Sequence, residues 1–254
     1  MGRPTPPALW TGREGPNPVG HRTRRSTVPS SELELDLVPI PPGTAQTGTL
    51  STQVEALAER FGVHPSWFDG ELPGARIELP AYDIGRTPVT NEQWAIFVAD
   101  GGGRAPDWWQ GPTPPEDLAD HPVTHVNLHD AQAFATWAGV RLPSAAEWER
   151  AARADAHRVF PWGDEMEPSH AHYGADGTAP VGSLPAGASP FGVLDLSGNV
   201  AEWTADQPDP ATAIVKGGSW VTTVPANLRV AAVGQSGWAL NRTDYIGFRV
   251  ARSR

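Results

Sequence analysis

The sequence predicts an α+β fold that is rich in loops and has few short helices and strands. Its 254 residues are enough for one large domain or two ordinary ones. The chain holds 27 Gly and 27 Pro and only 19% charged residues, which disfavours the long charged helices of a coiled coil or a helical bundle. Helical periodicity is confined to short segments before residue 155, and turns and short strands follow.

The first 30 residues differ in composition from the rest. They contain six Pro, four Gly and five Arg with almost no apolar periodicity, so they cannot bury enough surface to offset chain entropy. We expect a disordered leader over residues 1–30 and one folded domain over 31–254. The net charge of −10 disfavours nucleic-acid binding, and neither a membrane span nor a secretion signal is recognisable. We therefore expect a soluble, cytoplasmic protein.

The first half of the domain predicts two strands and a helix between them. Apolar and acidic residues alternate from Glu32 until a proline-rich turn that follows Ile40, which is typical of a strand. Residues 51–61 place apolar side chains at helical spacing behind a candidate cap, Ser51. Residues 75–84 return to alternation and predict one further strand.

Three capping patterns predict further helices. Thr90, Asn127 and Ser144 each precede an apolar helical pattern, and the last of these predicts a helix over residues 145–154. The cap at Asn127 falls between His125 and His129, so these two histidines do not share a helical face as metal ligands would. After residues 160–164, turns and short strands are expected.

The chain contains no Cys, no Walker loop, no GxGxxG and no GxSxG pattern. Disulfides, thiolate nucleophiles and iron–sulfur clusters are thereby excluded. The common nucleotide-binding and serine-hydrolase classes find no support either.

Seven short motifs nevertheless follow one another in a distinctive order. They are Thr87–Asn91, His121–Val123 with Asn127, Arg141–Glu149, Phe160–Gly163, Leu194–Trp203, Lys216–Trp220 and Ile246–Arg249. In this order they resemble the formylglycine-generating enzyme (sulfatase-modifying factor) family, and the match covers roughly residues 34–252. The resemblance implies the variant of the C-type lectin fold that this family adopts.

The resemblance also implies a structural calcium site in the Leu194–Trp203 motif. Carried over by motif, the ligands are the side chains of Asp195 and Glu202 and the carbonyls of Gly198 and Val200. Calcium prefers such hard oxygen ligands, and a glycine turn lets several converge. Alternatively, Asp195 begins a turn and Glu202 only accepts backbone N–H groups. A second calcium site of the family is shortened at residues 172–176 and is not expected.

The chain departs from the family in its catalytic residues. Formylglycine-generating enzymes oxidise a substrate cysteine with copper held by two of their own cysteines, and copper(I) needs thiolate ligands that this chain lacks. We therefore expect no copper and no formylglycine formation. Ergothioneine-type sulfoxide synthases of the same superfamily hold iron through the histidines of a helical-bundle domain, for which residues 1–30 are too short. No facial-triad spacing is recognisable among the histidines of the domain, at positions 64, 121, 125, 129, 157, 170 and 172.

Two functional interpretations remain. In the first, the domain is a catalytically silent binding module whose C-terminal loops contact a protein or a small molecule. The family includes cysteine-lacking paralogues and the variable proteins of diversity-generating retroelements. The candidate contact residues are Trp220, Thr222, Thr223, Asn227, Gln235, Trp238, Asn241, Asp244 and Tyr245. In the second, it is a metal-dependent oxidoreductase of unknown substrate, whose metal is held without thiolates or is supplied by a partner.

Overall fold

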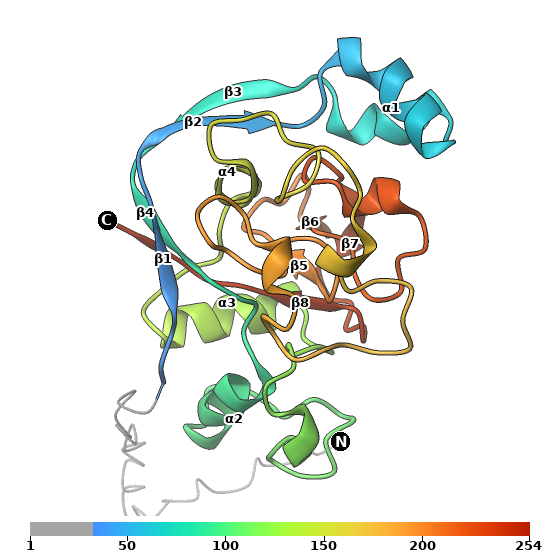
Figure 1. Ribbon diagram of the computed structural model, residues 1–254. Coiled ribbons are helices and arrows are strands. Elements are labelled where there is room, and N and C mark those ends of the chain that lie inside the picture. The colour runs from blue at the N-terminus through green and yellow to red at the C-terminus, as the bar shows by residue number, and fades with distance from the viewer. Residues whose placement is uncertain (1–32) are drawn as a thin grey trace, which may run out of the picture.

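The computed structural model describes residues 33–254, with only the backbone of residues 234–237, and the expected leader at residues 1–30 lies outside the described residues. A central sheet is surrounded by loops and by short helices and other strands (Figure 1). The strands are β1 (Leu37–Ile40), β2 (Gly43–Thr47), β3 (Ala75–Leu79), β4 (Tyr82–Gly85), β5 (Ala201–Trp203), β6 (Thr212–Lys216), β7 (Gly234–Trp238), β8 (Ile246–Phe248) and β9 (Ala251–Ser253).

The strands form three sheets. An outer sheet has the order β1-β4-β9, and β2 and β3 form a separate antiparallel pair of strands. The central sheet has the order β7-β6-β5-β8, in which β5 and β8 run parallel.

 Ala201 of β5 lies opposite Ile246 of β8 in parallel register. The chain between these two strands forms β6 and β7, which extend the sheet from the opposite edge of β5. The C-terminal loops therefore emerge beside the central sheet.

The α-helices are α1 (Val54–Phe61), α2 (Asn91–Ala99), α3 (Leu128–Trp137) and α4 (Ala145–Arg153). The caps predicted at Thr90, Asn127 and Ser144 are confirmed, and each side chain accepts an N–H from the third helical residue. His125 lies outside α3 with a φ of 59°, so it does not share a helical face with His129. Short 3₁₀ helices lie at Ser51–Gln53, Pro65–Glu71, Glu116–Leu118, Pro168–His170, Pro185–Gly187 and Pro225–Leu228.

Aromatic side chains form the centre of the largest core cluster. Trp94 of α2 stacks on Phe134 of α3 with 5.7 Å between ring centroids, and Phe248 of β8 meets both rings edge-on. Offset and edge-to-face pairs of this kind add stability beyond the buried area. They hold α2 and α3 against the central sheet.

Three local expectations were wrong. Residues 75–84 form two strands rather than one, because the chain breaks at Pro80 and β3 pairs with β2 while β4 pairs with β1. Ser51 is not a side-chain cap; it starts a 3₁₀ turn in which the Gln53 side chain accepts the Leu50 N–H. The strand expected from Glu32 begins only at Leu37.

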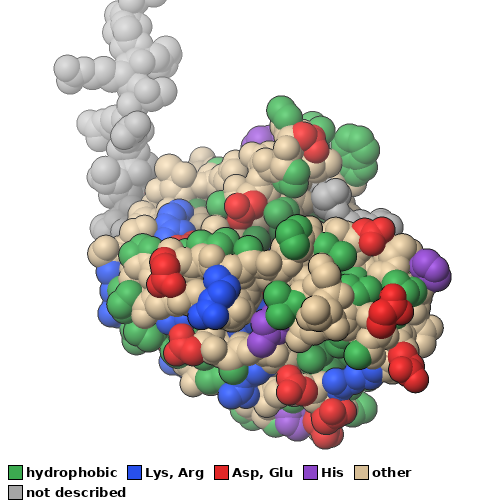
Figure 2. Space-filling view, turned by 90° about the horizontal axis from the view of Figure 1, so that it is seen from above, with side chains coloured by type: hydrophobic (Ala, Val, Ile, Leu, Met, Phe, Trp, Pro, Cys, Tyr) green, Lys and Arg blue, Asp and Glu red, His purple; other side chains and the backbone are tan. Residues whose placement is uncertain are grey.

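The part of the chain after residue 160 consists of turns, 3₁₀ helices and short strands, as predicted. In the described residues, no helix is long and apolar enough to cross a membrane. On the face shown in Figure 2, acidic and basic side chains are interspersed. That face offers no extended basic patch of the kind that tracks a phosphate backbone.

Candidate functional site

The loop expected to bind calcium is tightly coiled. Asp195, Gly198 and Asn199 all have positive φ, at 54°, 89° and 59°. A Cβ at Gly198 would stand 2.3 Å from the carbonyl oxygen of His172, so only glycine fits there. The amide side chain of Asn199 exchanges two hydrogen bonds of 3.1 Å with the backbone of Ala179, which fixes the loop.

Glu202 occupies a different environment from the one the sequence indicated. Its carboxylate is fully buried and accepts Nε and Nη2 of Arg249, both at 2.6 Å, and Nε1 of Trp148 at 2.8 Å. The same guanidinium donates to the carbonyls of Gly85 and Leu194, each at 2.9 Å. Glu202 thus joins a buried ion pair that links β5, α4 and the chain around β4 and β8.

The oxygens of the 195–202 loop suit a hard cation in part. Asp195 is half-buried, with one carboxylate oxygen accepting the Gly182 N–H at 2.7 Å. Burial raises the pKa of Asp195, although that hydrogen bond opposes the shift. Asp195 and the carbonyls of Gly198 and Val200 are ligands of the type that calcium prefers. Glu202 fits less well, because Arg249 already balances its charge and three donors already occupy its oxygens.

The C-terminal loops expose several large apolar side chains. Trp238 is 63% exposed, Leu240 68%, Val221 42% and Tyr245 36%. Of the predicted contact residues, Thr223, Asn241 and Asp244 are also exposed, while Trp220, Thr222 and Asn227 are half-buried. Gln235 lies in β7, and its side chain is outside the described atoms.

Hydrogen bonds bring some of these residues together. Nε1 of Trp220 donates to the Asp244 carbonyl at 3.1 Å, which joins the two C-terminal loops. The Asn227 side chain instead accepts a hydrogen bond through its Oδ1 from Nε1 of Trp67 at 2.8 Å, and Trp67 is 45% exposed. The structure therefore adds Trp67, from the 65–71 turn, to the edge of this surface.

A group of residues beside these loops was missed by the sequence reasoning. The backbone N–H of His125 donates to the Thr243 carbonyl at 2.7 Å, and the His125 ring lies 6.2 Å from Trp108. Nε1 of Trp108, Nε1 of Trp109 and Oγ1 of Thr243 are buried without a hydrogen-bond partner among the described residues. Buried unpaired donors and a positive φ at a non-glycine residue both concentrate at functional sites. The adjacent pair Trp108-Trp109 was the one signal in the sequence.

The histidines of the described residues do not converge on a metal. Across residues 33–254, no group of three or more His, Asp or Glu side chains is placed to hold an ion. His121 instead pairs with Thr178 at 2.8 Å, and His172 with the Gly177 carbonyl at 2.8 Å.

Comparison with known proteins agrees with this architecture. The model of the sulfatase-modifying factor enzyme 1-like domain matches residues 24–254. A hercynine oxygenase of Mycolicibacterium smegmatis is 37% identical over 211 residues, which cover 66% of this chain and 48% of that protein. The chain thus spans about half the length of this relative. A bovine protein named inactive C-alpha-formylglycine-generating enzyme 2 is 28% identical over 278 residues, covering 85% of this chain and 88% of that protein.

Solved structures share the fold. PvdO from Pseudomonas aeruginosa superposes with a TM-score of 0.69 at 26% identity, covering 86% of this chain and 94% of its own. Treponema denticola variable protein 1 shares the fold with a TM-score of 0.65 at 19% identity, covering 87% and 96%. The fold is the formylglycine-generating-enzyme type of the C-type lectin fold. By its seven motifs and this domain match, the chain belongs to the sulfatase-modifying factor family, as a member without cysteine.

Proposed function

We propose that this domain is a binding module that contacts a protein or small-molecule ligand through its C-terminal loops and forms no formylglycine. One observation carries this proposal. Of the seven large apolar side chains exposed among the described residues, four lie within residues 221–245: Val221, Trp238, Leu240 and Tyr245. Exposed aromatic and apolar side chains gathered in one region are typical of interaction sites.

Two further observations support this proposal. The chain has no thiolate with which to bind copper(I). The Nε1 atoms of Trp108 and Trp109 are buried and unpaired among the described residues, and the Trp108 ring lies near His125, whose N–H donates to the Thr243 carbonyl of these loops. Retroelement-driven diversification of residues 217–249 would suit such loops, and sequencing the neighbouring DNA for a near-copy of their coding segment tests it. We also propose a cytoplasmic location, which cell fractionation tests.

The binding role can be tested by comparing substitutions of exposed apolar residues in the loops with the same kind of substitution elsewhere on the surface. The full chain is screened against displayed peptides and an array of glycans, and each binder is measured with Trp238→Ala, Leu240→Ser and Ile77→Ser. Ile77 is 39% exposed on β3, away from the loops, and serves as the control. We expect the loop variants to weaken binding at least tenfold, about 1.4 kcal/mol. Equal losses in all three variants would contradict the assignment.

A second candidate function rests on a separate observation. The chain is 37% identical to a protein named hercynine oxygenase, so we propose as the alternative an oxidoreductase whose metal is completed by another segment or a partner. Metal analysis distinguishes the two functions. Stoichiometric iron in the purified protein, with oxygen consumption that depends on it, would favour the oxidoreductase.

We further propose a structural calcium ion at the 195–202 loop. Asp195 and the carbonyls of Gly198 and Val200 would hold it, with Glu202 as a weaker contributor because of its pairing with Arg249. The ion would rigidify the loop that precedes β5.

A further inference from the structure

A cluster of buried charged side chains packs around the end of α4. Three cations, Arg153, Lys216 and Arg229, are at most 2% exposed, and two carboxylates, Glu71 and Glu149, lie among them. Glu71 pairs with Arg229 through two oxygens at 2.5 and 3.0 Å. Glu149 lies 2.8 Å from Nζ of Lys216 but 3.7 Å from Nη1 of Arg153. Arg153 is therefore the cation with the weakest compensation.

Arg153 also has an unused donor. Its Nη1 donates to the carbonyls of Gln46 and Gly48, at 2.8 and 3.2 Å, whereas its buried Nε has no partner among the described residues. Burial lowers the pKa of Arg153, and the nearby Arg229 adds to the shift, while Glu149 opposes it. An isolated buried cation is costly unless an anion or a hydrogen bond compensates it.

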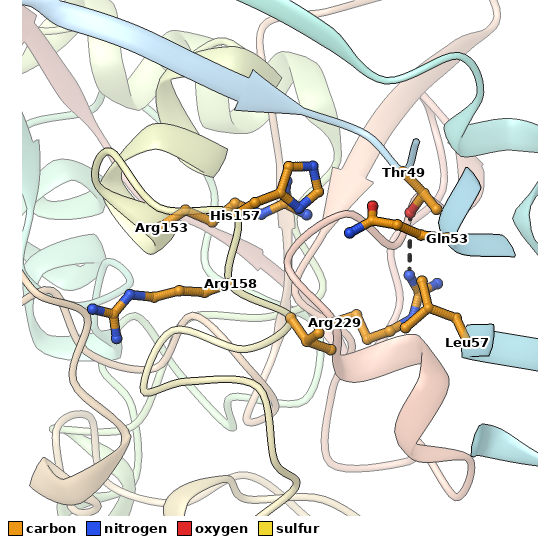
Figure 3. Close-up of a pocket in the computed structure, with 8 residues that line it drawn as sticks. Thr49, Gln53, Leu57, Arg153, His157, Arg158 and Arg229 are labelled. Carbon is orange, nitrogen blue, oxygen red and sulfur yellow. Dashed lines mark hydrogen bonds between the residues drawn. The ribbon is translucent and has the colours of Figure 1, made fainter. Parts of the chain in front are cut away.

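A small pocket opens at this arginine. About 230 Å³ of free space, part of it open solvent, lies within it, and the residues that line it include Thr49, Gln53, Arg153, His157, Arg158 and Arg229. In Figure 3, Arg153 at the end of α4 and His157 in the loop that follows extend toward Gln53, whereas the guanidinium of Arg158 points away. The Gln53 oxygen already accepts the Leu50 N–H, which leaves its NH₂ group as a donor. Donors rather than acceptors thus surround the space.

We propose that this pocket binds a small oxyanion, with Arg153 as its main ligand and Gln53 as a second donor. Arg153 has its nearest carboxylate at 3.7 Å and an unpaired Nε among the described residues, and a guanidinium fork matches an oxyanion. Inorganic phosphate and a simple carboxylate share the required chemistry.

The positive environment also explains the neighbouring histidine. Burial lowers the pKa of His157, and the Arg153 cation lowers it further. A bound anion would oppose both effects. The site joins the 49–57 segment to the end of α4, so binding would stabilise the docking of α1 on the domain.

The test is calorimetric titration of the full chain with sodium phosphate and with sodium acetate, at constant ionic strength held by chloride. We expect saturable binding of phosphate, of acetate or of both; which of them binds identifies the source of the oxyanion. Arg153→Gln should weaken it at least tenfold, and Gln53→Met severalfold. Arg252→Gln removes the same charge from an exposed side chain on β9, outside the pocket lining, and should leave affinity within twofold.

Melting curves with and without the anion accompany the titration. They give the ligand-dependent shift within each variant, so lower stability of Arg153→Gln does not obscure the result, and Gln53→Met tests the site independently of the buried arginine. No saturable binding of either anion, or equal losses in Arg153→Gln and Arg252→Gln, would overturn the proposal.

Discussion

Arg249 and Glu202 form a fully buried ion pair in which two guanidinium nitrogens each lie 2.6 Å from a carboxylate oxygen. Trp148 donates a third hydrogen bond to the same carboxylate. The pair connects the Leu194–Trp203 motif to the Ile246–Arg249 motif, which the chain separates by more than forty residues. It explains why both motifs contain a charged residue that faces the interior.

Breaking this pair should be strongly destabilising. Glu202→Gln leaves Arg249 buried without a counter-charge, and such losses cost about 3–5 kcal/mol. Urea denaturation measures the free energy of unfolding. The control is Asp107→Asn, which breaks an exposed pair with Arg104 and should change stability by about 0–1 kcal/mol. A Glu202→Gln effect as small as the control would contradict the structural role.

Calcium should raise the melting temperature of the wild-type protein. Because Glu202→Ala would destabilise the fold through Arg249, the informative variant is Asp195→Ala. We expect the difference in melting temperature between calcium and chelator to vanish in Asp195→Ala and to persist in Asp209→Ala, an exposed carboxylate elsewhere. If neither calcium nor chelator changes the melting temperature of the wild-type protein, the calcium site is contradicted.

Stability should fall as the pH drops below about 6.5. Burial lowers the pKa of His121, His125 and His157 below the usual value of 6.5. Below that value the unfolded chain binds more protons than the folded one, so the free energy of unfolding decreases until the folded pKa values are passed. Urea denaturation between pH 7.5 and 5.5 measures the slope.

The double variant His121→Gln with His125→Asn should reduce that slope, since two of the three groups are gone. Asn is chosen at position 125 because it tolerates the positive φ there. An unchanged slope in the double variant would show that these histidines do not control the acid response.

The protein should not convert a cysteine peptide to formylglycine. Copper(I) chemistry needs thiolate ligands, and the chain has no Cys. Incubation with copper, oxygen and a sulfatase-type peptide, followed by mass spectrometry, checks this, with an active formylglycine-generating enzyme as the positive control. An aldehyde product that depends on this protein would refute the prediction.

Local features were predictable because their causes are local. Thr90, Asn127 and Ser144 cap their helices by accepting an N–H only three residues away, so the sequence displays the whole interaction. The different pairing of β3 with β2 and of β4 with β1 was not predictable from residues 75–84, because the partner strands lie elsewhere in the chain. The strand β2 was missed for the same reason.

The candidate sites divide in the same way. The sequence alone determined the family through its ordered motifs, excluded thiolate chemistry through the absence of Cys, and indicated the apolar C-terminal loops. Only the tertiary structure decided that Glu202 is neutralised by Arg249 and that Arg153 and Gln53, a hundred residues apart, face one pocket. The physical reason is that burial and charge compensation depend on which side chains are in contact in the folded protein, and the spacing of residues along the chain does not determine those contacts.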